Sequence, residues 1–336
     1  MSLYIGNQKL GSLYLGSTKI KEAWVGNVKV YGSGDPYNPL NLPPFTIRIK
    51  YRSGLTPTQG DSQILVDPNE NIWDITKNDT SWDRLFADAS DLIEILGANS
   101  TGVTSMGNTF SSCGHMTSVA LFDTRSCTDM YNMFYNCSSL TTVPRFNTSS
   151  CTYMGGMFWG CSSLTTVPLF DTRSCEVMAN MFYECSSLTT VPLFDTSSCT
   201  YMGWMFSDCT SLSSVPLFDT RSCTNMGSMF QYCSSLDSVP LFDTSSCTDM
   251  SWMFSGCSSL TSIPLFDTGS CTDMRYTFAI CRNVQSGALA IYQQASTQAT
   301  SVTSHSETFM NCGSNTDTGL AELNQIPQSW GGLAQG

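Results

Sequence analysis

Charged residues are scarce in this sequence of 336 residues. They make up 12% of the chain, about half of the roughly 25% found in an ordinary globular protein. The 15 Lys and Arg are outnumbered by 27 Asp and Glu, which gives a formal net charge of -12. Nucleic acids and anionic membranes bind basic surfaces, so this composition argues against both as partners.

Histidine and long apolar runs are also rare or missing. The two histidines, His115 and His305, lie outside any G-x-S-x-G or H-E-x-x-H motif, so we expect neither a zinc enzyme nor a His-based triad. No run of about 18 apolar residues is present, so we expect no membrane insertion. The first residues, MSLYIGNQKLGS, lack a basic stretch followed by an apolar one, so we expect no signal peptide.

Cysteine, in contrast, is abundant and regularly spaced. Fifteen of the 16 cysteines fall into two series with a period of 24 residues, one from Cys127 and one from Cys113, and Cys312 is left over. The unit reads C-T-x-M-x-x-M-F-x-x-C-S-S-L-T-T-V-P-L-F-D-T-S-S. Six nearly complete copies occupy residues 127–270, a degenerate copy precedes them, and a partial copy follows. A fixed period of this length predicts a solenoid of stacked coils.

Two patterns alternate within each unit. Met130, Met133, Phe134 and Cys137 have the i, i+3, i+4, i+7 spacing of a short helix. The Thr- and Val-rich run at 140–146 precedes an Asn/Asp-Thr-Ser turn and predicts a short strand. The expected fold class is therefore an α/β repeat solenoid with one short helix and one short strand in each 24-residue coil.

The repeat strings carry a family resemblance. MFSGCSSLTSIPLFDTGSCTDM and MFYECSSLTTVPLFDTSSCTYM resemble the BspA-like leucine-rich repeats, in the variant with an F-D-T-S turn and an M-x-x-M-F segment. The resemblance covers about 180 residues. It implies a leucine-rich-repeat architecture and a role in recognition, often at bacterial surfaces, and it does not imply catalysis.

The ends of the chain predict further modules. LYIGNQKL, LYLGSTKI and AWVGNVKV recur every ten residues from Leu3 and indicate three small β-hairpins. Hairpins of this size are marginal alone, which favours attachment to another body or a homo-oligomer, for which we expect a trimer. A strand is expected at 45–52, and helices are expected at 82–96, 287–295 and 319–324. The predicted domains are a hairpin module at 1–34, a Gly/Pro linker at 35–44, an α/β cap at 45–100, the solenoid at 101–281 and a C-terminal cap at 282–336.

Both termini resemble proteins encoded by gut bacteriophages, including crAss-like ones. Decapeptide units like YLGSTKIKEAWVGNVKVY precede structural modules there, and tails like GSNTDTGLAELNQIPQSWGG close arrays of this repeat. The resemblance implies a virion protein, made in the cytoplasm of the bacterial host and released by lysis. Residues 1–31 would then contact other virion proteins.

The cysteine series suggests disulfides or metal ligands, but a simpler explanation is favoured. Successive cysteines of stacked coils would lie about 5 Å apart, yet parallel side chains fit the crossed S–S dihedral poorly. Val103 occupies a cysteine position in the degenerate copy, and zinc-site spacing is missing. We therefore expect buried, reduced cysteines that serve as small apolar groups.

The aspartates of the F-D-T turns also form a column, and a column of carboxylates suggests a calcium site. Asn147 replaces it in one coil, and both residue types cap turns by accepting a backbone N–H bond, so a turn cap is favoured. The following position alternates between Arg and Ser, which keeps like charges two coils apart. Identical residues repeated along a ladder do not converge as an active site requires. The predicted protein has no catalytic residue, metal site or cofactor.

Five positions per unit vary between copies, namely 129, 131, 132, 135 and 136 in the first complete copy. The seven copies at 103–270 contain 35 such positions, and Tyr, Trp, Ser, Gly, Asn and Asp fill 31 of them. Neutral drift on an exposed helix would instead favour Ala, Glu, Lys, Gln and Arg. Such a composition is typical of binding loops. The nine aromatic residues predicted to bind ligand are Tyr131, Tyr135, Tyr153, Trp159, Tyr183, Tyr201, Trp204, Tyr232 and Trp252.

These observations favour a non-enzymatic recognition protein. We expect a bacteriophage fibre- or adhesin-like component that binds a bacterial surface glycan or protein through this face, with weak contacts summed along the array. Tolerated surface composition and oligomer packing remain alternatives for the variable face. Two alternative functions remain open: a structural virion protein of the head or tail without a ligand, and a bacterial leucine-rich-repeat interaction module.

Overall fold

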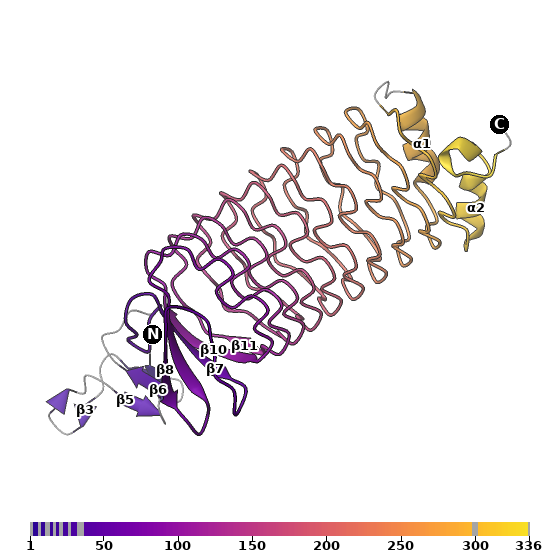
Figure 1. The fold of residues 1–336 in the computed structure, drawn as a ribbon. Helices are drawn as coiled ribbons and strands as arrows, with labels where there is room; N and C mark the ends of the chain where they lie inside the picture. Colours follow the sequence, from indigo (N-terminus) through magenta and orange to yellow (C-terminus); the bar gives the residue numbers. More distant parts are fainter. Residues whose placement is uncertain are drawn as a thin grey trace.

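The computed structural model describes residues 37–297 and 302–334 in full, together with the backbone of six short strands between residues 3 and 31. Coils from residue 80 to 281, and a further one at 304–312, stack into an elongated solenoid. A small sheet lies at its N-terminal end and two helices at its C-terminal end (Figure 1). No helix within the described ranges is both long and apolar enough to span a bilayer.

Each coil contains a run of β-turns, which we call the turn ladder. In residues 130–137, Met133 N donates to Met130 O (3.2 Å) and Tyr135 N donates to Asn132 O (3.0 Å). The alternate N–H groups leave the coil, as when Met130 N donates to Tyr153 O in the next one (3.1 Å). Main-chain hydrogen bonds between coils therefore fix the 24-residue register.

The turn ladder occupies the place of the helix predicted for every coil, and that prediction was wrong. An α-helix requires each N–H to bond four residues back, whereas here alternate N–H groups pair with the neighbouring coil. Met130, Met133, Phe134 and Cys137 are nevertheless fully buried. The apolar spacing identified the core positions, and stacking decided the backbone.

The strand predicted at 140–146 was also wrong. Pro144 has no N–H group to donate, which interrupts any ladder through this segment. In the equivalent segment of the next coil, one long main-chain bond remains, from Thr165 N to Thr141 O (3.4 Å). Adjacent coils share single parallel bridges instead, for example between Asp129 and Tyr153. The fold is a repeat solenoid built from turns and isolated bridges.

A five-stranded sheet covers the first coil, in the order β11-β10-β7-β9-β8. Its strands are β7 (Thr46–Tyr51), β8 (Ser62–Asp67), β9 (Ile72–Thr76), β10 (Leu92–Asn99) and β11 (Ser118–Val119). The strand predicted at 45–52 is confirmed as β7. The helix predicted at 82–96 was wrong, because residues 82–89 form an additional turn-ladder coil and residues 92–96 belong to β10. Trp82 and Phe86 are fully buried there, where the next coil carries Met106 and Phe110.

The C-terminal end is covered by α1 (Ala288–Thr297), α2 (Asp317–Leu323) and the 3-10 helix η1 (Gln328–Trp330). Both predicted helices are confirmed. Thr316 caps α2, since its side chain accepts a hydrogen bond from Gly319 N (3.0 Å). Phe309 of the last coil stacks on Phe278 with ring centroids 5.7 Å apart.

The predicted N-terminal hairpins are confirmed for the backbone. β1 pairs with β2, β3 with β4, and β5 with β6, each antiparallel. The residues between the two strands of each hairpin, which include Gly6, Gly16 and Gly26, lie outside the described residues. The strands are β1 (Leu3–Ile5), β2 (Gln8–Leu10), β3 (Tyr14–Leu15), β4 (Thr18–Lys19), β5 (Ala23–Val25) and β6 (Val28–Tyr31).

Columns of phenylalanine and cysteine fill the solenoid core. Phe134 stacks on Phe158 at 5.7 Å and also contacts Phe146 at 6.0 Å. Phe134 enters from the turn ladder and Phe146 from the F-D-T segment, so these two segments lie on opposite sides of the core. All 16 cysteines are buried and free, as predicted, and Cys137 Sγ donates to Phe110 O (3.1 Å).

A column of buried threonines joins the F-D-T segments of successive coils. Thr196 Oγ1 donates to Asp219 O (2.7 Å), and its equivalents from Thr124 to Thr244 make the same bond one coil further on. Thr268 ends the column, and its buried hydroxyl has no partner because no further F-D-T segment follows.

The end of this column provides a matched test of the threonine bond. We expect Thr196→Val to lower the free energy of unfolding by about 1–2 kcal/mol, because it leaves a buried carbonyl without its donor. Thr268→Val removes an unpaired hydroxyl and should be neutral or stabilising. Denaturant titration of both variants measures the difference, and equal losses would show that the bond contributes nothing.

Candidate binding face

The variable positions lie on the turn ladder, where two backbone positions per coil are left-handed. Asn132 has φ 52° and Asn136 has φ 55°. Each is the third residue of a four-residue turn, the position at which a type II turn requires positive φ. Asn and Gly adopt this conformation most easily. Part of the Asn and Gly enrichment therefore has a conformational cause that the sequence pattern alone did not reveal.

Bulky side chains occupy the same left-handed positions in later coils. Trp204 (φ 58°), Tyr232 (φ 58°), Trp252 (φ 59°) and Tyr276 (φ 58°) all have this conformation. A large non-Gly residue with positive φ is an outlier that costs free energy. Tyr276 was not among the predicted residues, although its position 24 residues after Trp252 gave the signal.

The structure places all nine predicted aromatic side chains at the surface, half-buried or exposed. Tyr131, Tyr153, Trp204 and Tyr232 are the most exposed, at 38–43%. A neighbouring coil makes room for one of these rings, because a side chain at Gly256 would collide with the ring of Tyr232 one coil earlier. The small residue at this position of one coil therefore has a packing reason.

Three predicted residues form a continuous row, which we call the aromatic ridge. Tyr135 lies against Trp159 with ring centroids 5.1 Å apart, and Trp159 lies 5.0 Å from Tyr183. The rings meet edge to face. The ridge spans three coils along the solenoid axis.

The other predicted aromatics form smaller groups. Tyr131 contacts Tyr153 at 5.5 Å, and Trp252 stacks on Tyr276 at 4.1 Å. Tyr201, Trp204 and Tyr232 have no ring contact among the described residues. The nine residues thus share one face of the turn ladder but do not converge on one pocket.

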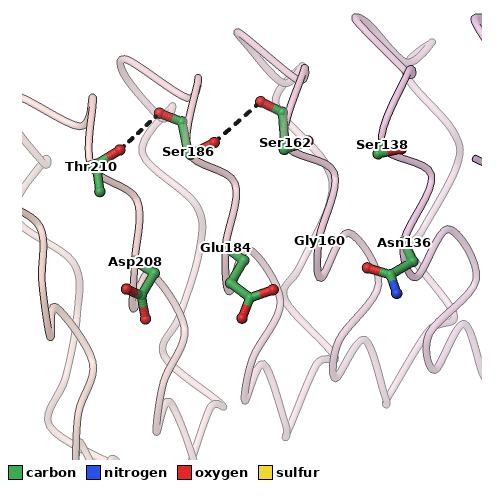
Figure 2. Close-up of a pocket in the computed structure, with 8 residues that line it drawn as sticks. All are labelled: Asn136, Ser138, Gly160, Ser162, Glu184, Ser186, Asp208 and Thr210. Atoms are coloured by element: carbon green, nitrogen blue, oxygen red, sulfur yellow. Dashed lines mark hydrogen bonds between the residues drawn. The ribbon is translucent and has the colours of Figure 1, made fainter.

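A polar groove with a volume of about 440 Å³ lies next to the aromatic ridge. Figure 2 shows its two rows, with Asp208, Glu184 and Asn136 in one and hydroxyl side chains in the other. In the second row, Thr210 Oγ1 donates to Ser186 O (3.4 Å). The full lining is Asn136, Ser138, Gly160, Ser162, Glu184, Ser186, Asp208 and Thr210.

The acidic part of this groove affects neighbouring proton equilibria. Burial raises the pKa of Asp208 above its ordinary value. Burial, helped by the charges of Glu184 and Asp208, raises the pKa of Tyr183 above its ordinary value. The three ridge residues were predicted individually from the sequence, but neither their continuous row nor the groove beside it was predicted.

The aspartate column caps turns, as predicted. Asp243 Oδ1 accepts from Ser245 N (3.1 Å), and Asn147 Oδ1 accepts from Ser149 N at the same distance. In alternate coils an arginine pairs with its own aspartate, for example Arg173 with Asp171 at 2.7 Å, and hydrogen bonding to that guanidinium lowers the pKa of the Asp171 carboxyl. No cluster of three or more metal-ligating side chains occurs in residues 37–297 and 302–334.

Comparison with known proteins gives one family. The family described as "Mycoplasma protein of unknown function, DUF285" matches residues 80–191, 104–215, 165–259 and 200–319, which together span more than half of the chain. No curated protein sequence matches this chain.

Comparison with solved structures matches several bacterial leucine-rich repeat proteins. One from Eubacterium ventriosum is 22% identical over 56% of this chain (TM-score 0.39), and the match spans only 45% of its own length. The T. pallidum leucine-rich repeat protein is 19% identical over 61% of this chain and 90% of its own (TM-score 0.40). A leucine-rich cell surface protein from Faecalibacterium prausnitzii is 16% identical over 79% of this chain and 89% of its own (TM-score 0.30).

Proposed function

The chain belongs to the family described as "Mycoplasma protein of unknown function, DUF285", and from this premise we propose that it is a non-enzymatic recognition protein. It binds a molecule displayed on a bacterial surface through the aromatic-rich face of the turn ladder. The observation that carries the proposal is the occupation of left-handed backbone positions by Trp204, Tyr232, Trp252 and Tyr276.

These four positions argue for selection on binding, because the aromatic residues are unfavourable for the fold. The left-handed conformation costs an ordinary L-residue roughly 1–2 kcal/mol, and Asn or Gly at the same position in other coils reduces this cost. Strain retained at several positions of one exposed face supports a functional role for that face.

The aromatic ridge and the polar groove together suit a carbohydrate chain. Aromatic rings offer apolar faces on which sugar rings stack, with little entropy to lose on binding. The groove beside Tyr183 supplies carboxylate, amide and hydroxyl groups for hydrogen bonds to hydroxyl-rich ligands. Because both features run along the solenoid axis, weak contacts from successive coils add up.

We further propose that the protein acts as a fibre- or adhesin-like component of a bacteriophage particle, with residues 1–31 contacting other virion proteins. The resemblance of both termini to gut-phage proteins supports this place. A structural virion protein without a ligand and a bacterial interaction module are the alternatives. The neighbouring genes test this role. Capsid and tail genes beside this one would support a virion protein, and bacterial genes on both sides would contradict it.

Replacing aromatic residues should separate binding from stability. We expect the triple variant Tyr201→Ser, Trp204→Asn and Trp252→Asn to bind bacterial cells at least tenfold more weakly, since aromatic hot spots contribute about 2 kcal/mol or more each. Its free energy of unfolding should stay the same or rise by about 1–2 kcal/mol, because Asn relieves two left-handed strains. Binding of the labelled full chain to a panel of gut bacterial strains measures the first effect, and thermal unfolding measures the second.

Asn180→Gly provides the matched control, because Asn180 has φ 58° at the position equivalent to Trp204. It changes the same backbone position without removing an aromatic ring, and should leave binding unchanged. A triple variant that loses stability along with binding would show that these residues serve the fold and would contradict the proposed site.

A further inference from the structure

Five leucines form an exposed row on the side of the solenoid opposite the turn ladder, which we call the leucine stripe. They precede the buried phenylalanine in five successive F-D-T segments and are 45–59% exposed. In an extended segment alternate side chains point to opposite faces, so the phenylalanine enters the core and the leucine faces outward. The stripe consists of Leu169, Leu193, Leu217, Leu241 and Leu265.

A regular row of exposed leucines differs from scattered surface apolar residues. With coils about 4.8 Å apart, the five side chains form a band roughly 19 Å long, and such contiguous apolar patches mark interaction sites. Between Leu217 and Leu241 a hollow of about 300 Å³ is open, so none of residues 37–297 and 302–334 covers it. Neither the proposed ligand face nor the core accounts for this row.

The charges beside the stripe indicate what covers it. Each of the six complete copies of the repeat at 127–270 has one stripe position, a turn-capping position two residues later, and a third position two residues after that. Numbered one to six, the coils carry at these positions Arg145-Asn147-Ser149, Leu169-Asp171-Arg173, Leu193-Asp195-Ser197, Leu217-Asp219-Arg221, Leu241-Asp243-Ser245 and Leu265-Asp267-Gly269. The formal charges of coils one to six at these positions are therefore +1, 0, -1, 0, -1 and -1.

This pattern is self-complementary when two stripes pack antiparallel. Suppose that the two-fold axis passes between coils three and four. Coil one of one copy then faces coil six of the other (+1 with -1), coil two faces coil five (0 with -1), and coil three faces coil four (-1 with 0). An axis through coil four would instead place coil three opposite coil five, both with charge -1. Like charges directly opposite one another are unfavourable, so the charges select the first arrangement.

In coil one an arginine ends the leucine row. Arg145 stands where the later coils have leucine, and Asn147 replaces the aspartate. In the antiparallel arrangement, Arg145 lies beside Leu265 and Asp267 of the other copy. An arginine packs its stem along apolar surface while its guanidinium reaches a carboxylate, so this exchange suits the edge of an apolar interface.

We propose that the leucine stripe is a homodimer interface, in which a second copy of this chain packs antiparallel through the same stripe. A two-fold interface uses the same patch on both copies, and here four leucine pairs form its centre with Arg145–Asp267 pairs at its two ends. Because Phe134 and Phe146 enter the core from opposite sides, the dimer leaves the turn ladder of each copy facing outward.

The oligomeric state of the full chain tests the proposal. Light scattering coupled to size-exclusion chromatography should give twice the 36.7 kDa chain mass. Leu217→Lys places two lysines next to the dimer axis and should raise the dimer dissociation constant at least tenfold. Leu55→Lys, at an exposed leucine away from the stripe, should leave it unchanged.

A charge exchange tests the antiparallel register. Arg145→Asp and Asp267→Arg should each weaken the dimer about tenfold, because each places like charges opposite one another twice. The double variant restores opposite charges and should return to within about threefold of the original dissociation constant. A wild-type chain that is monomeric, or an oligomer that Leu217→Lys leaves intact, would overturn the proposal. A double variant whose loss of dimer affinity equals the sum of the two single losses would overturn this register.

Discussion

Raising the pH from 8 to 10 under reducing conditions is expected to unfold the solenoid. All 16 thiols are buried, and burial raises the pKa of every one, that of Cys127 to about 12. In the unfolded chain a thiol ionises near pH 8.5. The folded-state pKa is the higher one, so the thiols contribute their full stability below about pH 8.5 and lose it as the pH rises towards the folded-state pKa.

The number of thiols makes this effect large. One pH unit above the unfolded-state pKa, each thiol reduces the free energy of unfolding by about 1.4 kcal/mol. The sixteen together lose on the order of 20 kcal/mol, more than the 5–15 kcal/mol that stabilise a typical domain. Tryptophan fluorescence and thiol reactivity, recorded against pH with a reductant present, should show unfolding between pH 9 and 10.

The chain itself supplies the control for this titration. Val103 occupies the position of the series that starts at Cys127 and is fully buried, so valine fits that environment. Replacing the seven cysteines of this series by valine should shift the midpoint of alkaline unfolding to higher pH. An unchanged midpoint would show that other groups control the transition.

Phe182→Ala is expected to lower the free energy of unfolding by about 3–5 kcal/mol, as truncation of a buried phenylalanine typically does. Phe182 is fully buried, and its ring centroid lies 5.7 Å from that of Phe158, 5.6 Å from Phe206 and 6.0 Å from Phe194. Truncation removes the contacts with all three and opens a cavity between coils. Urea titration followed by fluorescence measures the loss.

Two further variants show whether the loss comes from the cavity. Phe182→Leu retains most of the apolar volume and should lose clearly less stability than Phe182→Ala. Thr190→Ala, at an exposed position of the same coil, should stay within about 0.5 kcal/mol of the original protein. Equal losses in all three variants would contradict a central role for the phenylalanine column.

The candidate site was predictable in position but not in form. The sequence identified the variable positions and the nine aromatic residues, because variation against a strict repeat is visible in one chain. The sequence pattern could not show that positions such as Trp204 are left-handed or that a polar groove runs beside Tyr183. Both depend on how neighbouring coils place their backbones.

The sequence by itself determined the repeat, its 24-residue register and the buried positions, because burial follows the chemical type of each side chain. Met130, Phe134 and Cys137 are buried as the pattern predicts. The tertiary structure alone decided the backbone conformation. A short segment cannot satisfy its N–H groups both within a helix and with the next coil, and stacking resolves this by pairing Met130 N with Tyr153 O.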